Sequence, residues 1–103
     1  MEKFSRVTNG FNFVYEKELE AGETVILDMP VVSANKRGIN DIGWQTDSDD
    51  VILFGTLSSN PESDTALWQL IERDYEVNKT LSAIKIYNSG EMKSRIVIRA
   101  ILN

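Results

Sequence analysis

The chain has 103 residues, 42% of them hydrophobic, and a formal net charge of −5. This length fits one domain over residues 1–103 with a core of its own, and the composition argues against disorder. The chain has no cysteine and no histidine. Disulfides, thiolate metal sites and cysteine nucleophiles are thus excluded, and the commonest general base and metal ligand are missing.

No segment of the chain predicts a signal peptide, a membrane span or a nucleic-acid partner. The first ten residues, MEKFSRVTNG, have no apolar run of the kind found in signal peptides. The longest apolar stretches, VILF and IVI, are far shorter than the roughly 20 residues of a membrane span. The bases near the end are too few and too mixed with isoleucine to form a basic stripe.

Alternating apolar and polar residues predict a series of short strands. The expected strands are residues 11–19, 23–29, 42–46, 51–57, 81–87 and 94–102. The stretch VILFGTL over 51–57 is apolar on both faces, and Gly55 inside it predicts a bulge or a close backbone approach. Asn88-Ser89-Gly90, which precedes the last strand, predicts a hairpin connection.

Residues 60–78, NPESDTALWQLIERDYEVN, fit two structures. Asn60-Pro61-Glu62 is typical of a helix start, with a capping side chain, a proline in the first turn and then an acid. The apolar part spans only 66–71, which is short for a helix. We predict a loop or a single helical turn over 60–65 and a strand over 66–72.

Six or seven short strands in about 100 residues predict an all-β fold. Most of the strands have one strong apolar face, as expected when one side meets the core and the other meets water. We therefore expect a single-domain antiparallel β-sandwich, either jelly-roll or immunoglobulin-like.

The charges are spread unevenly along the chain. Residues 41–76 have a net charge of −8, whereas residues 77–103 have a net charge of +4. In one account, acidic loops pack beside basic strand edges within a single fold. In the other, the acidic segment of one copy meets the basic end of another, and this charge matching sets the orientation of the association.

Polar clusters in the loops provide little evidence for chemistry. Asp47, Asp49 and Asp50 could bind a hard cation such as calcium, but the EF-hand spacing is not met and we favour a solvated acidic turn without a metal. The serines and threonine of the 58–65 loop have no histidine or suitably spaced lysine as a base. We expect no enzyme activity and no cofactor.

The aromatic residues allow two interpretations. Trp44 and Trp68 could belong to the core or form a platform that stacks on sugars, and aromatics with a polar atom also favour protein interfaces. The second function considered is therefore a carbohydrate-binding module that uses Trp44 or Trp68, with calcium at Asp47 and Asp49 as an option.

Strands that are apolar on both faces predict an interface. VILF and RIVIRAIL carry more apolar surface than one side of a small sandwich requires, so a loop or a neighbouring subunit must cover the rest. We expect a homo-oligomer. The candidate interface residues are Ile52, Phe54, Trp68, Val97, Arg99 and Ile101.

From Trp44 onward, the chain carries in order GW, GTLSSNPE, LWQLI, VN, IKIYN and RIVIRAILN. This order resembles small all-β structural proteins of tailed bacteriophages, which decorate the capsid or are minor virion proteins. The resemblance implies a non-enzymatic virion component, assembled in the host cytoplasm, whose partner is a capsid or other virion protein. It assigns no individual binding residue, and the short N-terminus lacks the extended arm that could reach neighbouring subunits.

Overall fold

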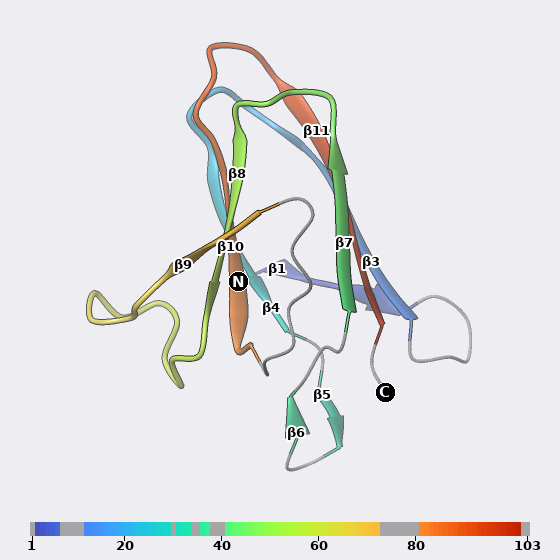
Figure 1. Ribbon diagram of the computed structural model, residues 1–103, viewed down its shortest axis with the longest axis vertical. Coiled ribbons are helices and arrows are strands. Elements are labelled where there is room, and N and C mark those ends of the chain that lie inside the picture. The colour runs from blue at the N-terminus through green and yellow to red at the C-terminus, as the bar shows by residue number, and fades with distance from the viewer. Residues whose placement is uncertain are drawn as a thin grey trace.

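The computed structural model describes residues 2–6, 12–29, 31–33, 36–37, 41–72 and 81–101. Every regular element in these ranges is a β-strand, and the long strands form two sheets packed face to face (Figure 1). The predicted all-β antiparallel sandwich is confirmed.

Five strands form the first sheet, four form the second, and a small hairpin lies apart from both. The first sheet, called sheet A, has the spatial order β1 (Glu2–Lys3), β4 (Thr24–Asp28), β10 (Ala83–Asn88), β8 (Val51–Thr56) and β9 (Gln69–Ile71). The second, sheet B, has the order β2 (Ser5–Arg6), β3 (Asn12–Leu19), β11 (Ser94–Ile101) and β7 (Asp41–Thr46). The hairpin joins β5 (Val31–Ser33) to β6 (Lys36–Arg37).

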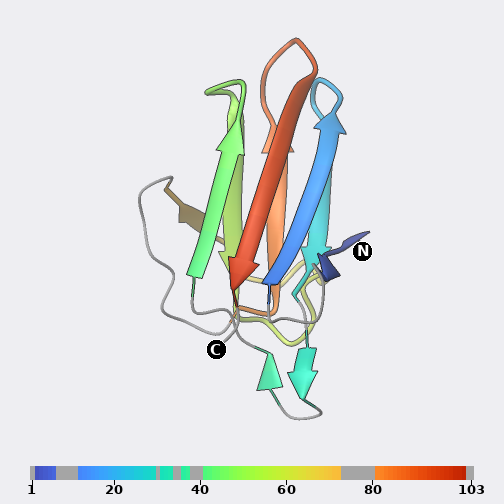
Figure 2. The same ribbon diagram turned by 90° about the vertical axis from the view of Figure 1, so that its right-hand side faces the viewer.

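The core lies between the sheets, where alternate residues of each long strand point inward. In β11, Ile96 and Ile98 are completely buried, whereas Arg95 before them and Arg99 after them are exposed. Period-two alternation directs successive side chains to opposite faces of a sheet, so the sequence pattern fixes which face of β11 is buried. Figure 2 shows sheet B in front, with β11 between β7 and β3, and sheet A behind it.

The N-terminal segment closes one side of the sandwich. β1 pairs in parallel with β4 of sheet A, and β2 pairs with β3 of sheet B, so the chain crosses between the sheets at Phe4. Phe4 packs against the core and meets Tyr15 edge to face, with ring centroids 6.4 Å apart. The long edge strands on the other side of the sandwich are therefore β7 and β8, with the short β9 beside β8.

The connection after β10 is not the predicted hairpin. β10 belongs to sheet A and β11 to sheet B, so residues 89–93 cross between the sheets. The Asn88 side chain, which is fully buried, holds this crossing in place. Its Nδ2 donates to the carbonyl oxygens of Met92 (2.8 Å) and Glu20 (3.2 Å), and its Oδ1 accepts from the Gly90 N–H (3.0 Å). The turn signal is real, but tertiary hydrogen bonds decide which strand follows it.

The segment from 60 to 72 fits the prediction in its first part and has a shorter strand than predicted in its second. Residues 60–65 lie in a loop, with two successive turns closed by hydrogen bonds from Ser63 N to Asn60 O and from Ala66 N to Ser63 O. The strand predicted over 66–72 is reduced to Gln69–Ile71, the three residues paired with β8. The Thr56 hydroxyl donates to the Leu67 carbonyl (2.7 Å), and this contact holds the preceding residues as a loop.

Candidate functional site

The outward side of sheet A carries an apolar row that crosses four strands. Strand register places Ile26, Lys85, Phe54 and Leu70 side by side, from β4 through β10 and β8 to β9. The next row contains Ile52 beside Tyr87. We call these residues, together with the overlying 57–68 loop, outer face A. Its apolar content follows from the β8 sequence VILF, which places hydrophobic side chains on both sides of the strand.

The loop over 57–68 covers only one end of the apolar row on sheet A. Under it, the outward-facing Thr56 and Ala83 are buried. Trp68 lies half-buried on the same face, with Lys85 Nζ 4.4 Å from its ring centroid, a cation–π contact. The leucines at the margin stay exposed: Leu57 by 62%, Leu67 by 84% and Leu70 by 57%. Within the part of the chain that the structure describes, the 57–68 loop therefore supplies only part of the cover that the sequence requires.

The outward side of sheet B, which we call outer face B, is charged instead. Arg95 Nη2 lies 2.7 Å from Glu16 Oε2. Val97 is half-buried among these polar neighbours, and Arg99 is exposed in a row with Val14 and Gly43. A side chain added at Gly43 would meet nothing within 4 Å, so the surface beside Arg99 is open.

The structure does not bring the six predicted interface residues together. Ile52, Phe54 and Trp68 belong to outer face A. Val97 and Arg99 belong to outer face B, on the opposite side of the sandwich. Ile101 ends β11, and its side chain lies outside the described residues. One flat patch therefore cannot contain them all.

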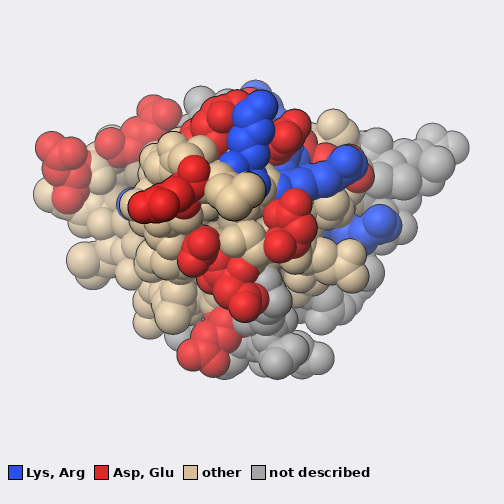
Figure 3. Space-filling model, turned by 90° about the horizontal axis from the view of Figure 1, so that it is seen from above, with Lys and Arg blue, Asp and Glu red and all other residues tan. Residues whose placement is uncertain are grey.

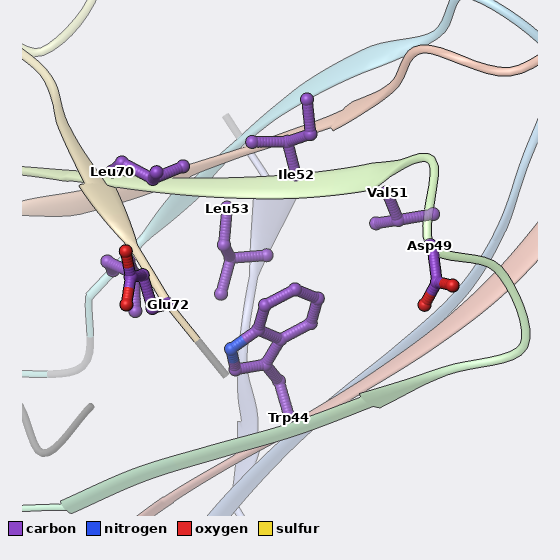
Figure 4. Close-up of a pocket in the computed structure, with 8 residues that line it drawn as sticks. Trp44, Asp49, Val51, Ile52, Leu53, Leu70 and Glu72 are labelled. Carbon is purple, nitrogen blue, oxygen red and sulfur yellow. The ribbon is translucent and has the colours of Figure 1, made fainter. Parts of the chain in front are cut away.

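A cleft of about 290 Å³ opens between the two sheets, beside β7, β8 and β9. β9 pairs with β8 only at Leu53, Phe54 and Gly55, so the edge of β8 is unpaired with β9 at Val51 and Ile52. The lining residues are Trp44, Asp49, Val51, Ile52, Leu53, Leu70, Ile71 and Glu72. Figure 4 shows the Trp44 indole rising from β7 toward Val51 and Leu53, with Asp49 and Glu72 on either side.

The cleft has apolar walls and only acidic charges. Trp44 packs against the core, while Asp49 and Glu72 are exposed to solvent. Its described lining residues include no lysine or arginine. Ile52 and Leu70 belong both to the cleft and to outer face A, so the two features form one continuous surface. Sequence patterns miss this cleft because it depends on where β9 diverges from β8.

Charged loops gather at one end of the sandwich, which Figure 3 shows from above. There the Asp47 carboxylate accepts the Arg95 backbone N–H (3.1 Å), and Lys93 Nζ lies 3.4 Å from Glu20 Oε1. These contacts fit the account in which acidic loops pack beside a basic strand within one fold. Among the described residues, no three carboxylates group closely enough to hold a metal ion.

An electrostatic cluster lies on the side closed by the N-terminal segment. Burial, followed by the negative charge of Glu2, raises the pKa of Tyr15 to about 12. Lys17 Nζ lies 3.3 Å from both Glu23 Oε2 and Glu2 Oε1, and these hydrogen bonds raise its pKa. The Glu20 backbone N–H donates to Glu23 and lowers the pKa of that carboxyl. This cluster fastens β1 and β3 together and does not form an open site.

Neither tryptophan offers a ring that is open on all sides. Trp44 packs against the core, and Lys85 lies over the Trp68 ring.

No helix in the described part of the chain is long and apolar enough to cross a bilayer.

The fold and this surface define a small all-β sandwich that exposes an apolar sheet face joined to an acidic cleft. No family model matches the chain, and neither a curated protein nor a solved structure matches it. Outer face A, the cleft and the order of sequence features from Trp44 onward are therefore the grounds for a functional proposal.

Proposed function

We propose that this chain is a non-enzymatic structural protein that acts by packing outer face A against another protein. The observation that carries the proposal is the row of Ile26, Phe54 and Leu70, which the described residues cover at only one end. Burying apolar area yields about 25 cal/mol per Å², and exposed apolar patches of this kind typically mark interaction sites.

Within this class, the proposed setting is the virion of a tailed bacteriophage, as a capsid decoration or minor structural protein assembled in the host cytoplasm. The support is the order of sequence features from Trp44 to the C-terminus. The partners would be a capsid protein or further copies of the chain. Detection of the chain in purified particles, or genes for capsid, portal and tail proteins beside its own gene, would test the setting.

The packing surface is tested by light scattering at micromolar concentration. The wild-type chain should form a defined oligomer or bind a larger shell, and Leu67→Lys should weaken that association because it places a charge on outer face A. Met92→Lys is the matched control, since Met92 is 79% exposed and Leu67 84%, and Met92 lies at the end of the sandwich. A strict monomer that binds no shell contradicts the proposal.

The carbohydrate-binding alternative stays a prediction. Binding on a glycan array that is lost in Trp68→Ala would favour it, and the coverage of Trp68 by Lys85 means that a sugar must use the rest of the ring.

A further inference from the structure

We propose that copies of this chain associate head to tail, with Val97 and Arg99 of one copy seated on the acidic cleft and adjoining apolar residues of the next copy. This inference rests on the proposed function, because it names the partner that covers outer face A. The site would be the cleft lined by Trp44, Leu53 and Glu72, and its ligand would be the Arg99 guanidinium of a second copy.

The charges that line the cleft are complementary to a cationic side chain. Asp49 and Glu72 line the cleft, and its described lining includes no base. The surrounding segment, 41–76, has a net charge of −8. A cationic side chain is therefore the occupant that this cleft favours, and like charges would be repelled.

The second argument is the position of Arg99 among the bases of the C-terminal part of the chain. Arg95 is held by Glu16 and Lys93 by Glu20. Arg99 instead is exposed in a row with Val14 and Gly43, where the surface is open. The next outward residue along β11, Val97, is apolar, so outer face B presents an arginine and a hydrophobic residue together.

The third argument is the fit of an arginine side chain to the cleft. A volume of about 290 Å³ corresponds to about ten water molecules at roughly 30 Å³ each. This lies at the lower limit of pockets that hold drug-sized molecules but accommodates one long side chain. The Arg99 stem and guanidinium would lie on Trp44 and Leu70, and the guanidinium would pair with a carboxylate at the rim.

The fourth argument is symmetry. A two-fold dimer uses one self-complementary patch, whereas a contact between two different patches is heterologous and builds rings or filaments. The cleft opens between the sheets beside β7, β8 and β9, whereas Val97 and Arg99 lie on outer face B, so the contact joins two different surfaces. Repeated head-to-tail contacts would use both surfaces of every inner copy.

Charge reversal tests this arrangement by sedimentation velocity over a range of concentrations. Arg99→Glu removes the cation and Glu72→Arg makes the cleft basic, so each variant alone should self-associate at least about tenfold more weakly than the wild type. The double variant, which carries both reversals, should recover association because the pair is restored with opposite signs.

Mixing the two single variants tests the head-to-tail geometry. The Arg99→Glu chain keeps an intact cleft, the Glu72→Arg chain keeps an intact Arg99, and the two reversed positions are also opposite in charge. A 1:1 mixture should therefore restore both contacts and grow beyond a heterodimer with the two chains alternating, whereas a closed two-fold contact would stop at the heterodimer. Lys3→Glu and Glu91→Arg are controls with the same changes in charge at exposed positions elsewhere, and they should associate like the wild type.

The outcomes separate this inference from the proposed function. Association that is lost in Leu67→Lys but retained in Arg99→Glu and Glu72→Arg would keep the packing role of outer face A and overturn the head-to-tail contact. A wild-type chain that binds a shell but never itself would do the same. A mixture that stops at a closed heterodimer, or a wild-type monomer at every concentration, would also overturn the inference.

Discussion

The two outer faces of the sandwich differ although the two sheets share one core. On outer face A, Ile26, Phe54 and Leu70 form an apolar row. On outer face B, Glu16 and Arg95 form an ion pair and Val97 is the half-buried apolar residue between charged neighbours. The difference shows that both sheets are built for stability on their inner faces, while only one carries apolar surface beyond what the core needs.

Substitutions on the inner faces should have the largest effect on the free energy of unfolding, and the effect should be similar in the two sheets. Leu53→Ala in sheet A and Ile98→Ala in sheet B each remove a completely buried side chain, so each should lower the free energy of unfolding by about 3 kcal/mol. Leu70→Ala, at a position 57% exposed on outer face A, should cost less than about 1 kcal/mol. Urea unfolding measures all three, and a large loss in Leu70→Ala would mean that outer face A belongs to the core.

Alkaline pH should weaken the side of the sandwich that the N-terminal segment closes. The pKa of Tyr15 is raised from 10.0 to about 12, so the folded chain holds this proton more tightly than the unfolded chain. The stabilisation is complete below pH 10 and is lost as the pH rises toward 12, by roughly 2 to 3 kcal/mol at 1.36 kcal/mol per pKa unit. Tyr15→Phe should lose this part of the pH dependence in unfolding curves measured from pH 9 to 12, and an unchanged slope would contradict the assignment.

Gly55 in sheet A and Gly43 in sheet B should respond differently to substitution by alanine. A Cβ at Gly55 would lie 3.0 Å from Leu81 Cδ1 and 3.1 Å from Ile71 Cδ1, whereas at Gly43 it would meet nothing within 4 Å. Gly55→Ala should therefore destabilise the fold by about 1 kcal/mol through overpacking, and Gly43→Ala should not. Thermal unfolding of both variants is the measurement, and equal shifts would show that Gly55 is not closely packed.

The smallest expected effect is on outer face B. Side chains of Arg95 and Glu16 are 64% and 50% exposed, and exposed ion pairs contribute less than about 1 kcal/mol. Arg95→Ala should therefore change stability only slightly, and the change should shrink further in 1 M salt because surface charges are screened. A larger loss that is insensitive to salt would indicate that this face is covered in solution.

The sequence predicts the alternation in β11 correctly, because alternation is a local property of the chain. At Gly55 it predicts a bulge or a close backbone approach, but β8 keeps its register with β10 there, and the close contacts come from the side chains of Leu81 and Ile71. It does not predict that Asn88 links two loops, since the carbonyls that Asn88 binds include those of Leu19 and Glu20, far away in the sequence. The acidic cleft was also beyond prediction, because Trp44 and Glu72 come together only through the packing of β7 beside β9.

The sequence by itself determined the fold class and the side of each long strand that faces the core, because a period of two residues dictates the direction of successive side chains. The tertiary structure alone decided that β10 and β11 belong to different sheets and that Ile52 and Val97 lie on opposite faces. The reason is physical: strand pairing and loop crossing depend on hydrogen bonds between distant segments, which leave no periodic signal in the residues themselves.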